Sequence, residues 1–497
     1  MHKHNNDLRP APGGPARFPR LAPLLFAALV LAGCATPQAI DPAALPAVPA
    51  AFKEADARWT VAAPADTQDR GAWWQLFADP VLDDLARRAA AQNADLQLAA
   101  ARLAQARALL RSSEANRRPQ LGLQAGAARQ AEPGARGVAE TAINVGATFS
   151  YELDLAGRLS ASARAATLDA QAREALLQST RLMVQADVAQ AYLALRALDS
   201  ERRLVRDTAG AYRDTLRLTE RRYEAGDVAE LDVARVRTEL ASTEAEAVAL
   251  DRRRAELEHA IAVLVGEPAS GFALADLSAS GNLPPSAEPP QVPPGLPSTV
   301  LARRPDVAAA QRGLMAAQER VGIARAAWFP SLSLTANGGH ASSELSDLFK
   351  WSARAWGVGA LLSLPVFDGG RREAGVQSAQ AELDAALASY RQQVLVAFRE
   401  VEDQLSGLRL LAQQSQLQQQ AVESASRATA LSASRYRNGL VSQLELLDAQ
   451  RSELRNRRQA LVVRAAQDQA TVGLVRALGG GWEAAPAGSV NPATAPG

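Results

Sequence analysis

The sequence predicts a mixed α and β protein made of two tandem copies of one unit, in which long helices flank pairs of strands. Three observations support this: the second half of the chain repeats the first, each half contains one very long helical pattern, and each half contains two segments of alternating apolar residues. The composition, with 47% hydrophobic and 22% charged residues, is that of an ordered protein.

Comparison of the chain with itself reveals the duplication. The segment that starts at Asp95 aligns without a gap on the segment that starts at Asp306, an offset of 211 residues. Farther along the offset becomes 213, and the motif Arg-Tyr-x-x-Gly recurs at 222–226 and at 435–439. A period this long indicates a duplicated half-protein and not a solenoid repeat.

The two repeats have the same internal order of helices, strands and turns. We expect repeat 1 at 71–265, with helices at 95–117, 158–223 and 229–265, strands at 119–130 and 141–154, and a hairpin tip at 222–232. We expect repeat 2 at 301–479, with helices at 306–328, 371–436 and 442–478, strands at 330–338 and 354–367, and a hairpin tip at 435–448.

The longest helical stretch in each repeat has a coiled-coil pattern. Between 158 and 223 there is no proline, and apolar residues recur at alternating spacings of three and four. Such a helix would extend about 99 Å at 1.5 Å per residue. The strand segments alternate with a period of two, as at Ile143, Val145 and Ala147, and suit a tilted membrane crossing of about 9–11 residues. A small soluble sheet packed on the helices is the alternative.

The N-terminus reads as an export signal. Basic residues precede a short apolar run at 21–32, which is too short to cross a bilayer. The run ends in Leu31-Ala32-Gly33-Cys34, which resembles the lipobox of bacterial lipoproteins and implies cleavage after 33 and acylation of Cys34. Ala35 follows the cysteine, where the inner-membrane retention signal would have Asp, so we expect the outer membrane. A lone buried thiol is the alternative for Cys34.

Three other segments lie outside the repeats. We expect an extended, lipid-anchored arm at 34–70, and a linker at 266–300 whose many prolines forbid a helix interior. We expect a disordered tail at 480–497.

Scarce residue types exclude several function classes. The net charge of +1 gives no electrostatic basis for nucleic-acid binding. Four histidines and one cysteine leave almost nothing from which to build a zinc site or a Cys–His pair. The phosphate-binding loop of nucleotide hydrolases is absent. We therefore expect no enzymatic activity and no cofactor, apart from the lipid on Cys34.

Two strands per repeat give four per chain, which is too few for a closed membrane barrel. An open sheet edge cannot face lipid, because its N–H and C=O groups would lack partners. Either the sheet is soluble or several chains share one barrel: two chains would give about eight strands, and three would give about twelve and leave a lumen. A lipid-anchored coiled-coil scaffold without a pore is a competing interpretation that leaves the strands unexplained.

Several motifs, in this order, resemble those of the TolC-type outer-membrane factors, in particular their lipoprotein branch (NodT- or OprM-like). The resemblance extends from about Cys34 to Gly479. Its motifs are Trp73-Trp74-Gln75-Leu76-Phe77-Ala78-Asp79-Pro80, Arg303-Arg304-Pro305-Asp306-Val307, Ala327-Trp328-Phe329-Pro330, Leu364-Pro365-Val366-Phe367-Asp368-Gly369-Gly370-Arg371 and Leu447-Asp448-Ala449-Gln450.

The resemblance implies a homotrimer with a twelve-stranded β-barrel in outer-membrane lipid and a long helical tunnel in the periplasm. It implies a passive exit channel for small molecules in a tripartite efflux system, of the RND type, with a periplasmic adaptor and an inner-membrane pump as partners. A duct for protein secretion is the alternative within the family.

The tips of the two helical hairpins are the candidate functional positions. Glycines suit helix–helix turns on structural grounds alone. The resemblance implies that the tips face the adaptor, through Arg222, Tyr223, Gly226, Arg435 and Gly439.

The resemblance also places a gate near the second tip, at Leu444, Glu445 and Asp448. The two acids are three residues apart and so share one helix face, although a solvated acidic pair is the alternative interpretation. Some family channels tie their tips together with an acid, a tyrosine and an arginine. Asp232 and Tyr436 occupy the first two places of this lock, and Val441 stands where the arginine would be.

Overall fold

The computed structural model describes residues 45, 47–54, 72–130, 139–276, 300 and 303–480. The predicted signal peptide at 1–33 and the lipidation site Cys34 lie outside these residues, as do most of the arm, most of the 266–300 linker and all but the first residue of the tail. The chain divides into two compact units, and each unit draws segments from both repeats: the first includes Ser113–Arg164 and Gln318–Ala381, and the second includes Ala165–Ala317 and Glu382–Gly497.

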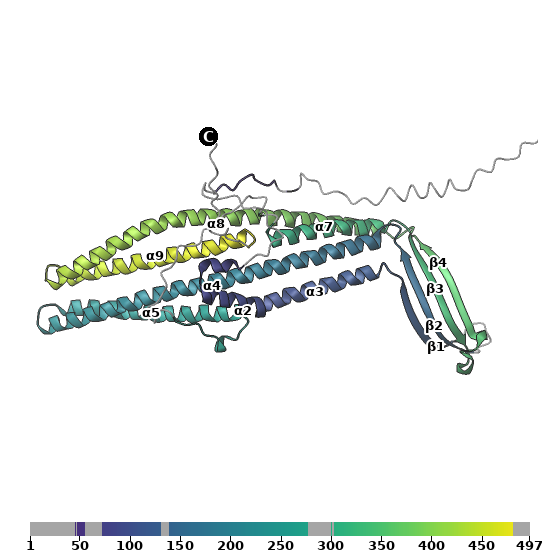
Figure 1. The fold of residues 1–497 in the computed structure, drawn as a ribbon, viewed down its shortest axis with the longest axis horizontal. Helices are drawn as coiled ribbons and strands as arrows, with labels where there is room; N and C mark the ends of the chain where they lie inside the picture. The colour runs from purple at the N-terminus through teal and green to yellow at the C-terminus, as the bar shows by residue number, and fades with distance from the viewer. Residues whose placement is uncertain are drawn as a thin grey trace, which may run out of the picture. The chain divides into compact units, whose positions relative to one another are not determined.

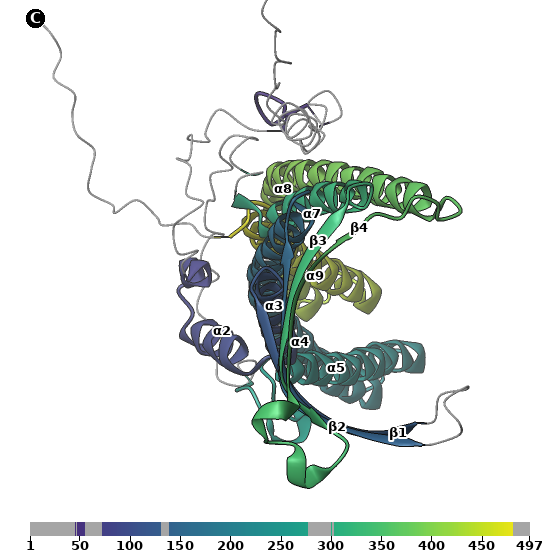
Figure 2. The same ribbon diagram turned by 90° about the vertical axis from the view of Figure 1, so that its right-hand side faces the viewer.

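The first unit is built around one antiparallel sheet of four strands in the order β1-β2-β3-β4 (Figure 1). Each repeat contributes two neighbouring strands, and the second view shows that the sheet is curved (Figure 2). The strands are β1 (Gln120–Gln130), β2 (Glu140–Leu153), β3 (Ser331–Ser342) and β4 (Arg354–Ser363).

Two predicted strand boundaries in repeat 2 were wrong. The strand predicted at 330–338 continues to Ser342, which pairs with Ile143, because β2 offers partners along this whole length. The glycines at 338 and 339 do not end it; a Cβ at Gly339 would clash with the carbonyl oxygen of Val145, so this close approach requires glycine. The strand predicted at 354–367 ends at Ser363, because β3 starts opposite it and Pro365 has no N–H to donate.

The two faces of the sheet differ in chemistry. Across the strands, Phe149 lies between Leu121 and Ala336, and Ala336 pairs with Val358, so these apolar residues share one face. Exposure on this face is high, at 88% for Leu123. The opposite face has small and uncharged polar residues at the alternate positions, including Gly122, Thr148, Asn337 and Gly357. The sheet therefore presents an apolar face and a polar face, and no other described element covers either face.

The second unit is helical and contains two long hairpins, α4 with α5 and α8 with α9 (Figure 1). None of the helices in the described part of the chain is long and apolar enough to span a membrane. The helices are α2 (Pro80–Gln92), α3 (Ala94–Ala115), α4 (Arg158–Glu224), α5 (Glu230–Leu264), α7 (Pro305–Ala326), α8 (Arg371–Arg437) and α9 (Gln443–Ala477), with 3-10 turns η2 (Trp73–Phe77), η3 (Ala269–Gly271), η4 (Leu345–Asp347) and η5 (Trp351–Ala353).

The helices of the second unit share a core that η2 and α2 help to close. Trp73 is 1% exposed, and Leu82 and Leu85 of α2 pack in the same cluster. Tyr192 of α4 donates a 2.7 Å hydrogen bond to Asp79, which also caps the N-terminus of α2. The motif that starts at Trp73 therefore has a structural role, in fastening α2 to α4.

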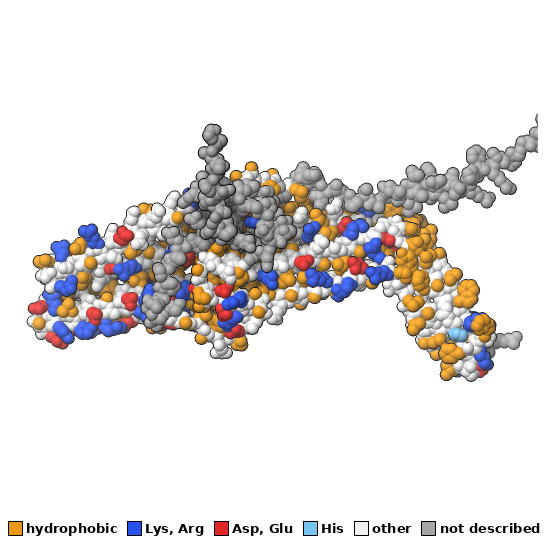
Figure 3. Space-filling model, viewed as in Figure 1, with side chains coloured by type: hydrophobic (Ala, Val, Ile, Leu, Met, Phe, Trp, Pro, Cys, Tyr) orange, Lys and Arg blue, Asp and Glu red, His pale blue; other side chains and the backbone are white. Residues whose placement is uncertain are grey.

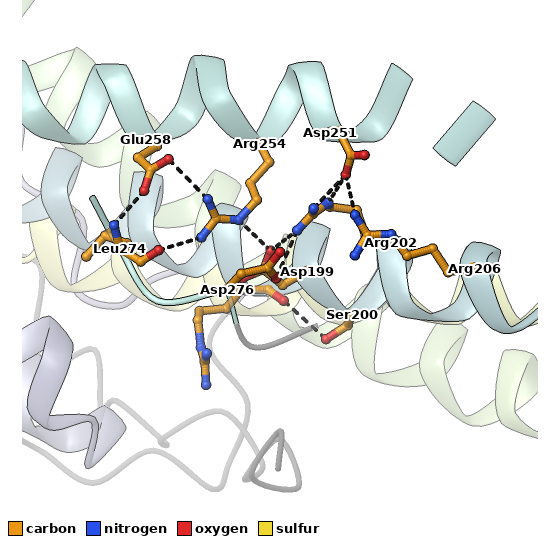
Figure 4. Close-up of polar contacts among 10 residues, drawn as sticks. Asp199, Ser200, Arg202, Arg206, Asp251, Arg254, Glu258, Leu274 and Asp276 are labelled. Carbon is orange, nitrogen blue, oxygen red and sulfur yellow. Dashed lines mark hydrogen bonds and ion pairs between the residues drawn. The ribbon is translucent and has the colours of Figure 1, made fainter. Parts of the chain in front are cut away.

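A buried ionic cluster braces the first hairpin (Figure 4). Asp199 of α4 is fully buried and accepts hydrogen bonds from Arg202 at 2.9 Å and from Arg254 of α5 at 3.0 Å. Arg202 also contacts Asp276, and Arg254 donates to the carbonyl of Leu274 at 2.9 Å. The chain that leaves α5 is therefore fixed to both helices of the hairpin.

A second buried cluster shows how the duplicated halves have diverged. Arg304 is 5% exposed and binds Asp306, Glu400 of α8 and the carbonyl of Ala477 at the end of α9. In repeat 1, Asn93 takes the corresponding place and donates to the carbonyl of Leu264. The backbone contact is thus kept in both halves, but only repeat 2 has the arginine.

The Arg304 cluster predicts a pH-dependent contribution to stability. Burial raises the pKa of Asp306, but the hydrogen bonds and charge of Arg304 outweigh burial and hold this pKa below its usual value. The stabilisation is therefore complete above the unfolded-state pKa of about 3.9 and is lost as the pH falls through the lower folded value. We expect Asp306→Asn to lower the free energy of unfolding by about 3 kcal/mol at neutral pH.

Thermal unfolding of wild type and variant at pH 7 and at pH 3 measures this contribution. The difference in Tm should be large at pH 7 and should shrink at pH 3. Asp95→Asn is the matched control, because Asp95 is exposed and has Asn93 where Asp306 has Arg304. A difference for Asp306→Asn that does not change with pH would contradict the ion-pair explanation.

Candidate functional site

The two hairpin tips have the same backbone geometry. Gly226 has φ +80° and Gly439 has φ +69°, a left-handed conformation that favours glycine. At the first tip the N–H of Asp227 donates to the carbonyl of Arg222, and at the second the N–H of Leu440 donates to the carbonyl of Arg435. Both turns are therefore Schellman caps, and no atom lies within 4 Å of a Cβ built on either glycine. Backbone conformation alone explains glycine at these positions.

The side chains of the repeated Arg-Tyr-x-x-Gly motif have different surroundings at the two tips. Tyr223 is 46% exposed, whereas Tyr436 is 4% exposed. The guanidinium of Arg222 lies 5.2 Å from the centre of the Tyr436 ring, a cation–π contact that joins the two hairpins. Arg435, the counterpart of Arg222, is exposed. The first tip therefore presents its tyrosine outward, and the second tip buries its tyrosine against the first.

The predicted lock between Asp232 and Tyr436 is not formed in this structure. Asp232 pairs at 3.5 Å with Arg235, one turn along its own helix. The hydroxyl of Tyr436 is buried and has no hydrogen-bond partner among the described residues. Val441 supplies no cation to complete the lock, and the contact of Tyr436 with Arg222 replaces it.

The three predicted gate residues lie in the first two turns of α9. Leu444 is 49% exposed, and Glu445 and Asp448 are exposed as well. Between them, Leu447 is 1% exposed and packs with Tyr212 and other apolar residues of the first hairpin. The helix is thus held by its buried face and leaves the predicted gate residues on its outer face.

Glu445 also has a local structural role. Ser442 is the N-cap of α9, and its hydroxyl accepts a 3.4 Å hydrogen bond from the N–H of Glu445. A serine three residues before a glutamate is the sequence pattern of a capping box. The sequence reasoning that selected Glu445 for its charge missed this pattern.

The structure reveals a ladder of ion pairs that joins the hairpins and that sequence reasoning missed. Arg451 of α9 pairs with Glu239 of α5, and Arg458 pairs with Glu246 at 2.5 Å and with Glu201 of α4 at 2.6 Å. The arginines are seven residues apart, and so are Glu239 and Glu246. Since α5 and α9 both start at a tip and run in the same direction, this heptad spacing was the signal that could have revealed the pairs.

The ladder ends before the tips. One heptad closer to the tips, Asp232 and Leu444 occupy the corresponding positions and cannot form an ion pair. Tyr212 lies beside the last ion pair; burial and the charge of Glu239 raise the pKa of Tyr212 to about 12, although Arg451 opposes the shift. The hairpins are therefore tied by charge up to Glu239 and Arg451, and beyond them by the packing of Leu447 on the first hairpin and by the contact of Arg222 with Tyr436.

On the side of the ladder away from the tips, an open groove of about 770 Å³ lies along α4, α5 and α9. Its floor consists mainly of alanines and leucines, and Glu201 and Arg253 are among the charged residues that line it. The described residues include no group of three or more His, Cys, Asp or Glu side chains placed to hold a metal ion. The arrangement offers surfaces and contacts between the hairpins.

Comparison with known proteins identifies the family. The model of the outer membrane efflux protein family matches residues 85–267 and 296–480. The chain is 34% identical over 471 residues to the pyoverdine export outer membrane protein OpmQ of Pseudomonas aeruginosa, covering 93% of this chain and 96% of that protein. It is 34% identical over 413 residues to the toluene efflux pump outer membrane protein TtgI of Pseudomonas putida, covering 82% and 87%.

Solved structures agree with this assignment. The outer-membrane channel OprN superposes with a TM-score of 0.80 at 31% sequence identity, covering 90% of this chain and 100% of that chain. The neighbours are TolC-type channels, and the four antiparallel strands and long helical hairpins described above fit that fold. The protein therefore belongs to the outer membrane efflux protein family, as its TolC-type motifs predicted.

Proposed function

We propose that this protein, an outer-membrane efflux channel by family, works as a homotrimer that forms the passive exit duct of a tripartite system. The sheet is the observation that supports this most directly. Its apolar face is not covered by the described residues, and β1 and β4 each have one edge that no described strand pairs. Unpaired edges are too costly in lipid, so neighbouring chains must close them, and three copies give about twelve strands with a lumen.

The second face of the sheet supports a role in conduction. Small and uncharged polar residues such as Thr148 and Asn337 would line the lumen, as expected for a water-filled barrel. The chain has no nucleotide-binding motif, so the energy would come from an inner-membrane pump. The similar proteins are named for export of pyoverdine and efflux of toluene, which favours small-molecule export over protein secretion.

The lipid anchor and the tips would provide the other attachments. Acylated Cys34 would hold the N-terminus in outer-membrane lipid. The exposed residues of the tips, Tyr223 and Arg435 in particular, would meet a periplasmic adaptor, together with Arg222, Gly226 and Gly439. A tyrosine that is half-exposed at the first tip and buried at the second favours the first tip as the apolar contact point.

The gate would form where three copies of the second hairpin meet. Leu444, Glu445 and Asp448 lie on the exposed face of α9, so a three-fold axis would bring six carboxylates and three leucines into one narrow ring. Repulsion within the ring opposes closure. The pairs of Arg451 with Glu239 and of Arg458 with Glu246 would oppose that repulsion by holding the second hairpin against the first.

The oligomeric state is the first test. Native mass analysis in mild detergent should show three chains, and the same sample should give conductance steps in a planar bilayer. A folded protein that stays monomeric and never conducts would favour the pore-less scaffold.

Asp448→Ala tests the position of the gate. Removing half of the ring's acids should lower cation preference, because rings of Asp and Glu attract cations. Single-channel recording at two ionic strengths measures this, with Asp214→Ala as control, because Asp214 is an exposed acid on α4. Unchanged selectivity and conductance in an intact trimer would place Asp448 outside the aperture.

Charge reversal tests the ladder. Arg451→Glu should raise the resting conductance, because it replaces an attraction to Glu239 by a repulsion between hairpins, and adding Glu239→Arg should restore closure. The matched control is Arg213→Glu, since the pair of Arg213 with Glu244 lies within the first hairpin. If the control opens the channel as far as Arg451→Glu does, general destabilisation explains both results.

A further inference from the structure

The turn between β4 and α8 carries a motif that conduction and gating do not explain. β4 ends at Ser363 and α8 begins at Arg371. In the turn, Val366 is 90% exposed and Phe367 is 91% exposed, more than any other large apolar side chain of the described residues. Two adjacent apolar side chains this exposed indicate contact with something outside the chain.

The turn is held in place by specific contacts. The carboxylate of Asp368 accepts hydrogen bonds from the N–H of Gly370 at 3.1 Å and from the N–H and Nε of Arg372 at 3.2 and 2.7 Å. The guanidinium of Arg372 in turn lies 4.6 Å from the centre of the Trp328 ring. Phe367 is therefore displayed by a braced turn, and Trp328, the aromatic residue that Arg372 contacts, is itself 47% exposed.

Exposed apolar residues lead from the end of the sheet into the turn. Leu362 of that face is 63% exposed, and Leu364, two residues later, is 47% exposed. Hydrophobic side chains gather along the sheet and at its junction with the helices (Figure 3). At the other end of the strands, the aromatic residues Phe349, Trp351 and Trp356 are also exposed.

The two exposed apolar groups lie beyond or near opposite ends of β4, and the length of β4 is close to the thickness of the apolar part of a membrane. Ten residues at about 3.4 Å extend roughly 34 Å, and a tilt of about 40° reduces this to roughly 26 Å along the membrane normal. The apolar band of outer-membrane barrels is about 25 Å tall and is bordered by aromatic residues on both sides. The 364–367 turn therefore falls at the edge of the band on the side of the helices.

We propose that residues 364–367, with Trp328, form an anchor that inserts Val366 and Phe367 into the boundary between headgroups and acyl chains of the periplasmic phospholipid leaflet. Arg371 is exposed beside this turn and would face the lipid phosphates. The proposal rests on the proposed barrel, because the membrane orientation of the sheet defines this boundary. It assigns the contact to lipid, not to a second copy of the chain.

Repeat 1 has no equivalent of this anchor. At the corresponding junction, Asp154 caps α4 by accepting hydrogen bonds from Leu159 and Ser160 at 3.0 and 2.7 Å. The adjacent Leu155 is 49% exposed, and no aromatic residue takes the place of Phe367. The conserved part of the two junctions is thus the carboxylate that caps the helix, and the apolar pair is specific to repeat 2.

Spin labels at single introduced cysteines provide the test, because Cys34 is the only natural cysteine. We would label Phe367→Cys in trimers reconstituted into phosphatidylethanolamine–phosphatidylglycerol vesicles and compare collisions with oxygen, which partitions into lipid, and with a water-soluble nickel chelate. Val358→Cys on the apolar face is the lipid control, and Leu361→Cys on the opposite face is the water control. We expect the 367 label to show a depth between the two, near the phosphates.

Each other outcome overturns a definite part of the proposal. A 367 label as open to the nickel chelate as the 361 label would place the turn in water. A 367 label immobilised and closed to both reagents would mean that a neighbouring chain covers it. If the 358 label itself fails to reach lipid, the barrel proposal is wrong, and the anchor fails with it.

Discussion

The unpaired edges of a four-stranded sheet constrain everything else in this protein. Each edge presents backbone N–H and C=O groups that lipid cannot satisfy, so a sheet whose apolar face enters a membrane must be closed by other strands. One chain supplies too few strands. The proposal that several copies share one barrel follows from this constraint.

The two halves of the duplication keep the same backbone contacts and differ in their side-chain contacts. The glycine caps at 226 and 439 are the same turn made twice. Yet Tyr223 is exposed and its counterpart Tyr436 is buried under Arg222. Likewise Asn93 and Arg304 donate hydrogen bonds to equivalent backbone carbonyls, and only Arg304 also binds carboxylates. Backbone roles are kept in both repeats, whereas charge and aromatic roles are assigned to one of them.

Between the shared core and the tips, ion pairs attach the second hairpin to the first. Within the described hairpins, the Asp199 cluster ties α4 to α5 through buried charges, which are costly to separate. The pairs of Arg451 and Arg458 with glutamates of the first hairpin are partly exposed and weaker. Weaker contacts between the hairpins than within the first hairpin would suit the gate proposed at the second tip.

The sequence by itself determined the duplication, the order of helices and strands, the four alternating strands and the family, because these follow from period, alternation and motif order along the chain. Only the tertiary structure decided which equivalent residues of the two repeats make different contacts. Asp232 and Tyr436 occupy the positions expected for a lock, but Asp232 forms an ion pair with Arg235 and the Tyr436 ring contacts Arg222. The ends of β3 and β4 depended on how far a neighbouring strand extends, and the Glu239–Arg451 pair joins residues 212 positions apart. Contacts of this kind depend on which helices and strands lie side by side, and that information is not local in the chain.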